Sequence, residues 1–115
     1  IIGKPHTHAR AVEQLTAASG KRIEFLTGLC LLNAATGRCR VVIEPFSVVF
    51  RKLSADGIER YLRADTPYDC AGSFKLEDRG ITLFERLEGR DPNALIGLPL
   101  IALIDLLHAE GVQIP

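Results

Sequence analysis

The sequence predicts an α/β protein with a mixed sheet flanked by helices. Its 115 residues suit one hydrophobic core. Hydrophobic residues make up 47% of the chain and charged residues 24%, as in ordinary globular proteins. Apolar runs typical of strands alternate with segments of helical periodicity, and the order is helix, two strands, helix, strand, helix. These three observations together favour the α/β class.

The first predicted element is a helix within residues 6–20, HTHARAVEQLTAASG. Thr7 is a suitable N-cap, because its hydroxyl can accept a hydrogen bond from a free backbone N–H of the first turn. Val12 and Leu15 follow helical spacing. Gly20 is a typical residue at the end of a helix, so we expect the chain to turn there.

Residues 21–53 predict a β-hairpin of two long strands. The turn is expected at residues 35–38, where Gly37 can supply the positive φ that hairpin turns need. Both apolar runs are almost continuous, so we expect a sheet that is covered on both faces. Pro45 has no N–H to donate, which predicts either a bulge or an edge position in the second strand.

Three further elements complete the expected fold. A helix is predicted over residues 54–65, capped by Ser54. Alternating side chains predict a strand over residues 81–89. The last helix is expected over residues 99–111, because Pro99 suits a first turn and a glycine ends the segment. The apolar stripe of the second helix consists of Ile58, Tyr61 and Leu62.

Charge and composition exclude several classes of function. Lys and Arg total 14, as do Asp and Glu, so bulk charge indicates no nucleic-acid or membrane partner. The apolar stretch 98–107 is too short to span a bilayer, and no stretch resembles a signal peptide. We therefore expect a cytoplasmic protein. Cys30, Cys39 and Cys70 match no zinc spacing and are expected to be reduced, although a bridge between Cys30 and Cys39 is conceivable across the hairpin.

Lys4 is the first candidate functional residue. It lies in a Gly-Lys-Pro turn just before a helix, where a lysine can bind a phosphate that also faces the helix N-terminus. The alternative is an ordinary exposed loop lysine. His6 and His8 form a His-x-His pair that suggests a metal, but side chains two residues apart near a helix start diverge, so we do not expect them to share an ion.

The second candidate is the acidic pair Glu77 and Asp78, in a polar segment between two apolar runs. A solvated turn is one interpretation. The other is recognition of a base, because one carboxylate can accept two hydrogen bonds from the adjacent N–H donors of a guanine edge. The sequence has no glycine-rich phosphate loop, nucleophile elbow or metal-ligand motif. The residues alone thus predict a polar site around Lys4 and Glu77.

The sequence closely resembles the Maf family of nucleotide pyrophosphatases, and the resemblance covers essentially the whole chain. It implies a fold similar to that of inosine-triphosphate pyrophosphatases, in which two lobes enclose a groove beside a mixed sheet. The segments that carry the resemblance are GKP at 3–5, TGLCLLN at 27–33, EPFSVVF at 44–50, CAGSFK at 70–75, GITLFERLEGRDPN at 80–93 and GLPLIAL at 97–103.

The resemblance implies a nucleotide diphosphatase that uses a divalent metal cation, magnesium or manganese. Such enzymes cleave a nucleoside triphosphate between the α and β phosphates. The segment 73–93 is similar to the subgroup that converts 7-methyl-GTP to 7-methyl-GMP and diphosphate, so we expect this substrate. One alternative is dTTP or UTP. Another is a non-catalytic binding or dimerisation module, because Maf proteins are linked to inhibition of septum formation. A homodimer is a possible assembly.

The resemblance also assigns roles to single residues. Lys4 matches the Gly-Lys-Pro lysine implicated in catalysis and phosphate binding. Glu77 matches a specificity position that is Glu in the 7-methyl-GTP subgroup and Gln in the dTTP and UTP subgroup. Counting back from Gly80 favours Glu77, with Asp78 as the alternative reader of the base. The metal ligands are unknown.

Some family motifs do not occur in residues 1–115. The family has a Ser-rich loop followed by an arginine, and an Asp-Gln pair shortly before Gly-Lys-Pro, whose aspartate is the presumed general base. We therefore expect residues 1–115 to be the C-terminal portion of a single Maf-like domain. This portion by itself is expected to be inactive.

Overall fold

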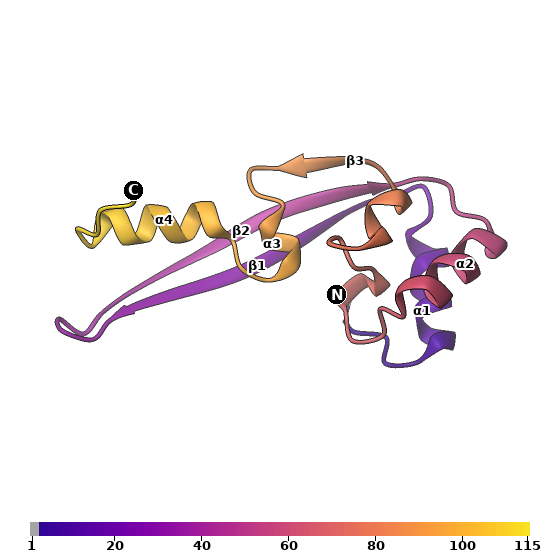
Figure 1. Ribbon diagram of the computed structural model, residues 1–115, viewed down its shortest axis with the longest axis horizontal. Coiled ribbons are helices and arrows are strands. Elements are labelled where there is room, and N and C mark those ends of the chain that lie inside the picture. The colour runs from indigo at the N-terminus through magenta and orange to yellow at the C-terminus, as the bar shows by residue number, and fades with distance from the viewer. Residues whose placement is uncertain (1–2) are drawn as a thin grey trace. The chain divides into compact units, whose positions relative to one another are not determined.

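The computed structural model describes residues 3–115, which form two compact units (Figure 1). Among the described residues, unit 1 contains residues 3–23 and 48–87, and unit 2 contains residues 24–47 and 88–115. Both units combine helix with strand, so the α/β class is confirmed. Each unit is described by itself below.

Two capped helices lie side by side in unit 1 (Figure 1). Helix α1 spans His8–Ala18, and the hydroxyl of its N-cap Thr7 accepts a hydrogen bond of 3.2 Å from the Arg10 N–H. Helix α2 spans Ala55–Asp65, and Ser54 caps it by accepting from the Gly57 N–H at 3.0 Å. Both N-caps were predicted from the sequence and are confirmed.

The predicted hairpin is present, but its expected coverage on both faces is wrong for the described residues. Strand β1 spans Arg22–Asn33 and strand β2 spans Arg38–Phe50. Gly37 ends the turn between them with a φ of +74°, as expected. Alternate residues of β1 are exposed: Leu26 retains 65% of its surface, and Val41 of β2 retains 71%. A continuous apolar run therefore did not reveal which face is packed.

The sheet has the order β1-β2-β3, in which β3 spans Phe84–Gly89. Its strands are antiparallel within the described residues, whereas a mixed sheet was expected (Figure 1). A four-residue turn can join only antiparallel neighbours, which fixes the first pair. Because β2 is central, the edge position considered for Pro45 is wrong. The strand expected from residue 81 starts later, because Arg79–Leu83 form a 3₁₀ helix, η2.

Short helices that the sequence analysis did not predict surround these elements. A 3₁₀ turn, η1, spans Ala71–Ser73 in unit 1, and helix α3 spans Asn93–Ile96 in unit 2. Helix α4 spans Leu100–Ala109, in agreement with the predicted last helix. The buried Asp91 organises this part of unit 2, because its carboxylate accepts from the backbone N–H of Asn93 and of Ile101, both at 2.9 Å.

The end of α4 is fastened to the hairpin within unit 2. The Glu110 carboxylate accepts hydrogen bonds from the Asn33 amide at 2.9 Å and from the Arg40 guanidinium. These two contacts lower the pKa of Glu110 below its usual value.

The three cysteines are free thiols, as expected, and the Sγ atoms of Cys30 and Cys39 lie 2.8 Å apart.

An aromatic cluster forms the core of unit 1. Phe50, Phe74 and Phe84 are almost completely buried and meet edge to face, with ring centroids 4.9–6.0 Å apart. Burial of each such side chain contributes about 1.5–3 kcal/mol, so this cluster is a major source of stability. It fixes the end of β2, the start of β3 and the start of the polar segment that follows Phe74. Within residues 3–115, no helix is long and apolar enough to cross a membrane.

Candidate functional site

The acidic pair lies at the tip of a tight turn over residues 75–80, which we call the acidic turn. The Lys75 carbonyl accepts from the Gly80 N–H at 2.8 Å and from the Asp78 N–H at 3.3 Å. A Cβ at Gly80 would lie 2.3 Å from that carbonyl oxygen, so the turn requires glycine there. Glu77 and Asp78 are both exposed, and neither carboxylate has an ion-pair partner among the described residues. Both are therefore available to a ligand.

Helix α2 holds the acidic turn at both ends. The buried Tyr61 hydroxyl accepts a hydrogen bond of 2.7 Å from the Lys75 N–H. Asp65, which is 5% exposed, accepts from the Arg79 N–H at 2.8 Å and from the Arg79 guanidinium at 2.9 Å, one bond on each carboxylate oxygen. Burial raises the pKa of Tyr61, so its phenol stays neutral at physiological pH. Two side chains of one rigid helix thus fix the backbone that carries Glu77.

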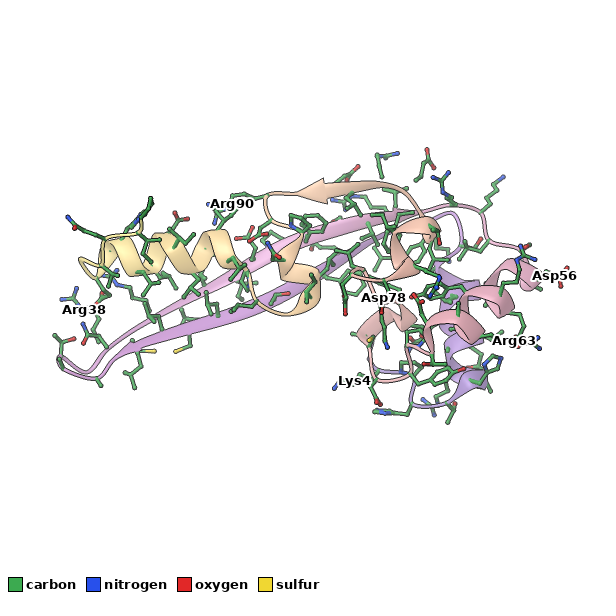
Figure 2. All side chains as sticks on the ribbon, viewed as in Figure 1. Lys4, Arg38, Asp56, Arg63, Asp78 and Arg90 are labelled. Atoms are coloured by element: carbon green, nitrogen blue, oxygen red, sulfur yellow. The ribbon has the colours of Figure 1, made fainter. Side chains whose placement is uncertain are left out.

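Lys4 lies in a loop that is tied to η1. The Gly3 carbonyl accepts from the Gly72 N–H at 3.4 Å and from the Gln14 side-chain amide at 3.0 Å. The other end of that amide accepts from the Ser73 hydroxyl at 2.6 Å. The Lys4 side chain itself is exposed at the surface of unit 1 and has no carboxylate partner among the described residues (Figure 2). It is therefore free to meet a phosphate.

Cys70 directly precedes η1 and belongs to unit 1, as Lys4 and Glu77 do. Burial raises the pKa of its thiol, and the negative charge of Glu77 raises it further, while the positive charges of Lys75 and Lys4 oppose the change. The structure brings the two predicted site residues into the same part of unit 1, although no direct contact joins them.

The His-x-His pair does not form a site. The two ring nitrogens of His8 contact the Tyr68 hydroxyl at 2.8 Å and the Glu59 carboxylate at 2.9 Å, whereas His6 faces Asp69 at 3.8 Å. Within residues 3–115, no three His, Cys, Asp or Glu side chains converge as metal ligands. The described residues therefore do not make up a metal centre.

The sequence of the chain matches a known protein family. Residues 1–110 match the family described as Maf-like protein. The chain belongs to the Maf family. Its curated Maf relatives include proteins named 7-methyl-GTP pyrophosphatase from Pseudomonas syringae pv. tomato, Alcanivorax borkumensis and Pseudomonas fluorescens. They are 61%, 61% and 63% identical to the chain over all 115 of its residues, which correspond to 60%, 58% and 60% of their own lengths. The chain thus spans about three-fifths of these relatives.

Sequence reasoning missed the residues that hold the acidic turn of this Maf protein. Tyr61 was assigned only to an apolar stripe, and neither Asp65 nor Arg79 received a role. One signal was available, because Asp65 is the last residue of a helix, where the helix dipole disfavours a negative charge. An acid in that position suggests a separate partner, although the sequence does not identify it as Arg79.

Proposed function

We propose that the whole protein hydrolyses nucleoside triphosphates between the α and β phosphates and prefers 7-methyl-GTP. The supporting observation is identity of about 60% over the entire chain to Maf relatives that are named 7-methyl-GTP pyrophosphatases. Residues 1–115 would form the C-terminal portion of a single Maf-like domain whose two lobes enclose a groove. We further propose a cytoplasmic location, where nucleoside triphosphates are made.

In this proposal Glu77 reads the base. Its carboxylate offers only acceptors, which suits the N1–H and the exocyclic amine of guanine. Its negative charge also suits the cationic ring of a 7-methylated guanine. An exposed, unpaired carboxylate on a turn that is held at both ends is well suited to this task, because little conformational freedom is lost on binding.

Lys4 would bind the phosphates. An unpaired lysine can neutralise the charge that develops on the transferring phosphoryl group. Its loop is fixed to η1 through Gly3, so its position relative to the start of the acidic turn is defined. A divalent cation, magnesium or manganese, remains part of the proposal on the family resemblance alone.

The base-reading role predicts a change of preference in the full-length protein. Glu77→Gln should move the ratio of kcat/KM values from 7-methyl-GTP towards UTP by at least about tenfold, since mismatched buried polar pairs cost roughly 1–3 kcal/mol. Glutamine can donate to a uracil carbonyl, whereas glutamate would set acceptor against acceptor. The matched control is Asp78→Asn, which should change the ratio little. If only Asp78→Asn changes it, the role passes to Asp78.

The phosphate-binding role predicts a loss of turnover. Lys4→Ala in the full-length protein should lower kcat about a hundredfold, because one charged contact to a transferring phosphate contributes about 3 kcal/mol. Its melting temperature should stay unchanged, since the side chain is exposed and unpaired. Lys21→Ala, another exposed lysine in unit 1, is the control. Turnover close to that of the unsubstituted protein would remove Lys4 from the site.

The rival proposals predict different outcomes. A dTTP or UTP pyrophosphatase would show the highest kcat/KM with those nucleotides before any substitution. A non-catalytic module would associate without releasing diphosphate, and exposed apolar side chains on β1 and β2 give it, or a homodimer, a surface to use. These side chains are Leu26, Leu32, Val41 and Ile43. We expect residues 1–115 alone to be inactive. Diphosphate release by that chain would contradict this expectation.

A further inference from the structure

A cavity of about 380 Å³ lies in unit 1, next to the acidic turn, and shares Tyr61 and Arg79 with it. It is formed where β2 ends, where α2 begins and along η2. Neither Lys4, Glu77 nor Asp78 lines it. Four of its lining side chains are basic and none is acidic, in a chain whose charges balance overall. These four, Arg51, Lys52, Arg60 and Arg79, are called the basic cluster below.

Most of the basic cluster lacks a carboxylate partner. Arg51, Lys52 and Arg60 form no ion pair with any of the residues that the structure describes. One guanidinium nitrogen of Arg79 pairs with the Asp65 carboxylate, and the Arg79 side chain is still 66% exposed. Among the described residues, Asp65 is thus the one carboxylate that pairs with the basic cluster. Like charges that line one cavity repel one another, and a bound anion would reduce this repulsion.

The remaining polar groups of the cavity also suit an anion. Ser54 contributes a hydroxyl that can donate a hydrogen bond, whereas the hydroxyl of Thr82 already donates to the Arg79 carbonyl at 2.6 Å. The N-terminal end of α2 contributes Ser54 and Gly57 to the wall, and the Asp56 carboxylate in its first turn offsets the partial positive charge of that helix end. Asp56 itself does not line the cavity and lies at the N-terminal end of the helix (Figure 2). No negative group on the cavity wall therefore opposes an anion.

We propose that this cavity binds a small multivalent phosphate anion, of which inorganic diphosphate is the simplest. Its volume lies within the range of small-ligand sites and easily accommodates two phosphate groups with ordered water. The basic cluster gathers around one cavity and forms no extended stripe, which favours a compact ligand over a nucleic-acid strand. The phosphate can be free or part of a nucleotide tail, and the chemistry of recognition is the same.

The cavity has a structural connection to the acidic turn. Arg79 belongs to the basic cluster, and its backbone N–H and guanidinium are also the groups that Asp65 holds. An anion that draws the Arg79 guanidinium into the cavity would compete with Asp65 for it. Binding would then loosen one anchor of the turn that carries Glu77. The effect on the turn that carries Glu77 rests on the proposed function. The anion-binding site itself does not.

The test is calorimetric titration of the full-length protein with inorganic diphosphate. Arg60→Gln and Lys52→Gln should each weaken binding by about tenfold or more, because a hydrogen bond to a charged group contributes about 1.5–3 kcal/mol. Added salt should weaken binding as well. The control is Arg63→Gln, which removes the same charge from α2 at a position paired with Glu59 and outside the cavity (Figure 2). It should leave the affinity unchanged.

Two further measurements make the result decisive. Lys4→Ala separates the two phosphate sites, because it should spare the binding event that Arg60→Gln weakens. A parallel titration with 7-methyl-GTP, with EDTA present so that the proposed metal-dependent hydrolysis does not run, identifies the source of the phosphate, since a nucleotide tail would bind more tightly than free diphosphate and lose affinity in the same two variants. Absence of diphosphate and nucleotide binding, or binding that only Lys4→Ala removes, would overturn the proposal. Loss of catalysis alone would contradict the proposed function and leave this binding result standing.

Discussion

Replacement of Asp65 by asparagine tests whether helix α2 holds the acidic turn. The two oxygens of Asp65 each accept one bond from Arg79, at 2.8 Å and 2.9 Å. Asparagine keeps the size of the side chain but has one acceptor, so its NH₂ group must face an N–H donor. One charge-assisted bond is lost at a position that is 5% exposed. Such a loss costs about 2–3 kcal/mol, and exposure of the guanidinium places the value near the lower end.

The assay is native-state hydrogen exchange of the backbone amides of Arg79 and Gly80 in the full-length protein. A loss of about 2 kcal/mol should speed local opening of the turn about thirtyfold. The kcat/KM ratio between 7-methyl-GTP and UTP should fall at the same time, because Glu77 is no longer held in one position. The combination of faster exchange and weaker base selectivity distinguishes positioning from a general loss of stability.

The control for this prediction is Asp69→Asn. Asp69 is another aspartate of unit 1, but its side chain is 93% exposed. It should leave the exchange of both amides unchanged. If Asp65→Asn also leaves their exchange unchanged, the two bonds to Arg79 do not hold the turn. If both variants speed exchange equally, the effect reflects net charge and the reasoning from Asp65 geometry is refuted.

Two predictions concern the stability of unit 2. Burial raises the pKa of the Asp91 carboxyl, but its backbone N–H donors outweigh this and leave the pKa lowered. Its stabilising contribution is therefore complete above the unfolded pKa of about 3.9 and is lost as pH falls through the lower folded pKa. Urea unfolding should show this loss, Asp91→Asn should remove it, and exposed Asp105→Asn should not. Gly89→Ala would set a Cβ 2.3 Å from the Phe46 ring and should cost about 1–3 kcal/mol, with a lower melting temperature, whereas Gly28→Ala should not clash.

The elements that could be predicted are those whose signals are local. Thr7 and Ser54 cap helices by bonding backbone N–H groups three residues away, so the sequence neighbourhood contains the whole interaction. Gly37 is another local case, because its positive φ depends on the turn itself. Such features are specified by a few adjacent residues and were found at the expected positions.

The elements that could not be predicted depend on partners distant in the sequence. Arg79 lies 14 residues from Asp65, and no spacing rule connects a helix end with a later turn. The same distant bonds help to stabilise η2 where alternating side chains suggested strand. The exposed face of β1 was also missed, since Leu26 has the same apolar character whether or not another element covers it.

The residues alone indicated a polar site around Lys4 and Glu77, and the family resemblance supplied the roles proposed for them. Both side chains are exposed in unit 1, which agrees with either a site or an ordinary solvated surface. Their roles as phosphate and base ligands stay predictions. What the sequence could not supply was the support beneath Glu77, because Tyr61 looked like any other apolar-stripe residue until its hydroxyl was seen on the Lys75 N–H.

Under the proposed role of Glu77, the architecture of the acidic turn would separate the choice of substrate from the stability of the fold. Its anchors act on the backbone at Lys75, Arg79 and Gly80, whereas the side chain at position 77 takes no part in holding the turn. An exchange of Glu77 for another polar residue should therefore alter recognition while costing little folding free energy. If position 77 reads the base as proposed, mutation there could change the nucleobase that is recognised without first requiring a compensating change elsewhere. Asp65 and Gly80, in contrast, cannot be exchanged without loss of the turn, because they hold its backbone whatever residue occupies position 77.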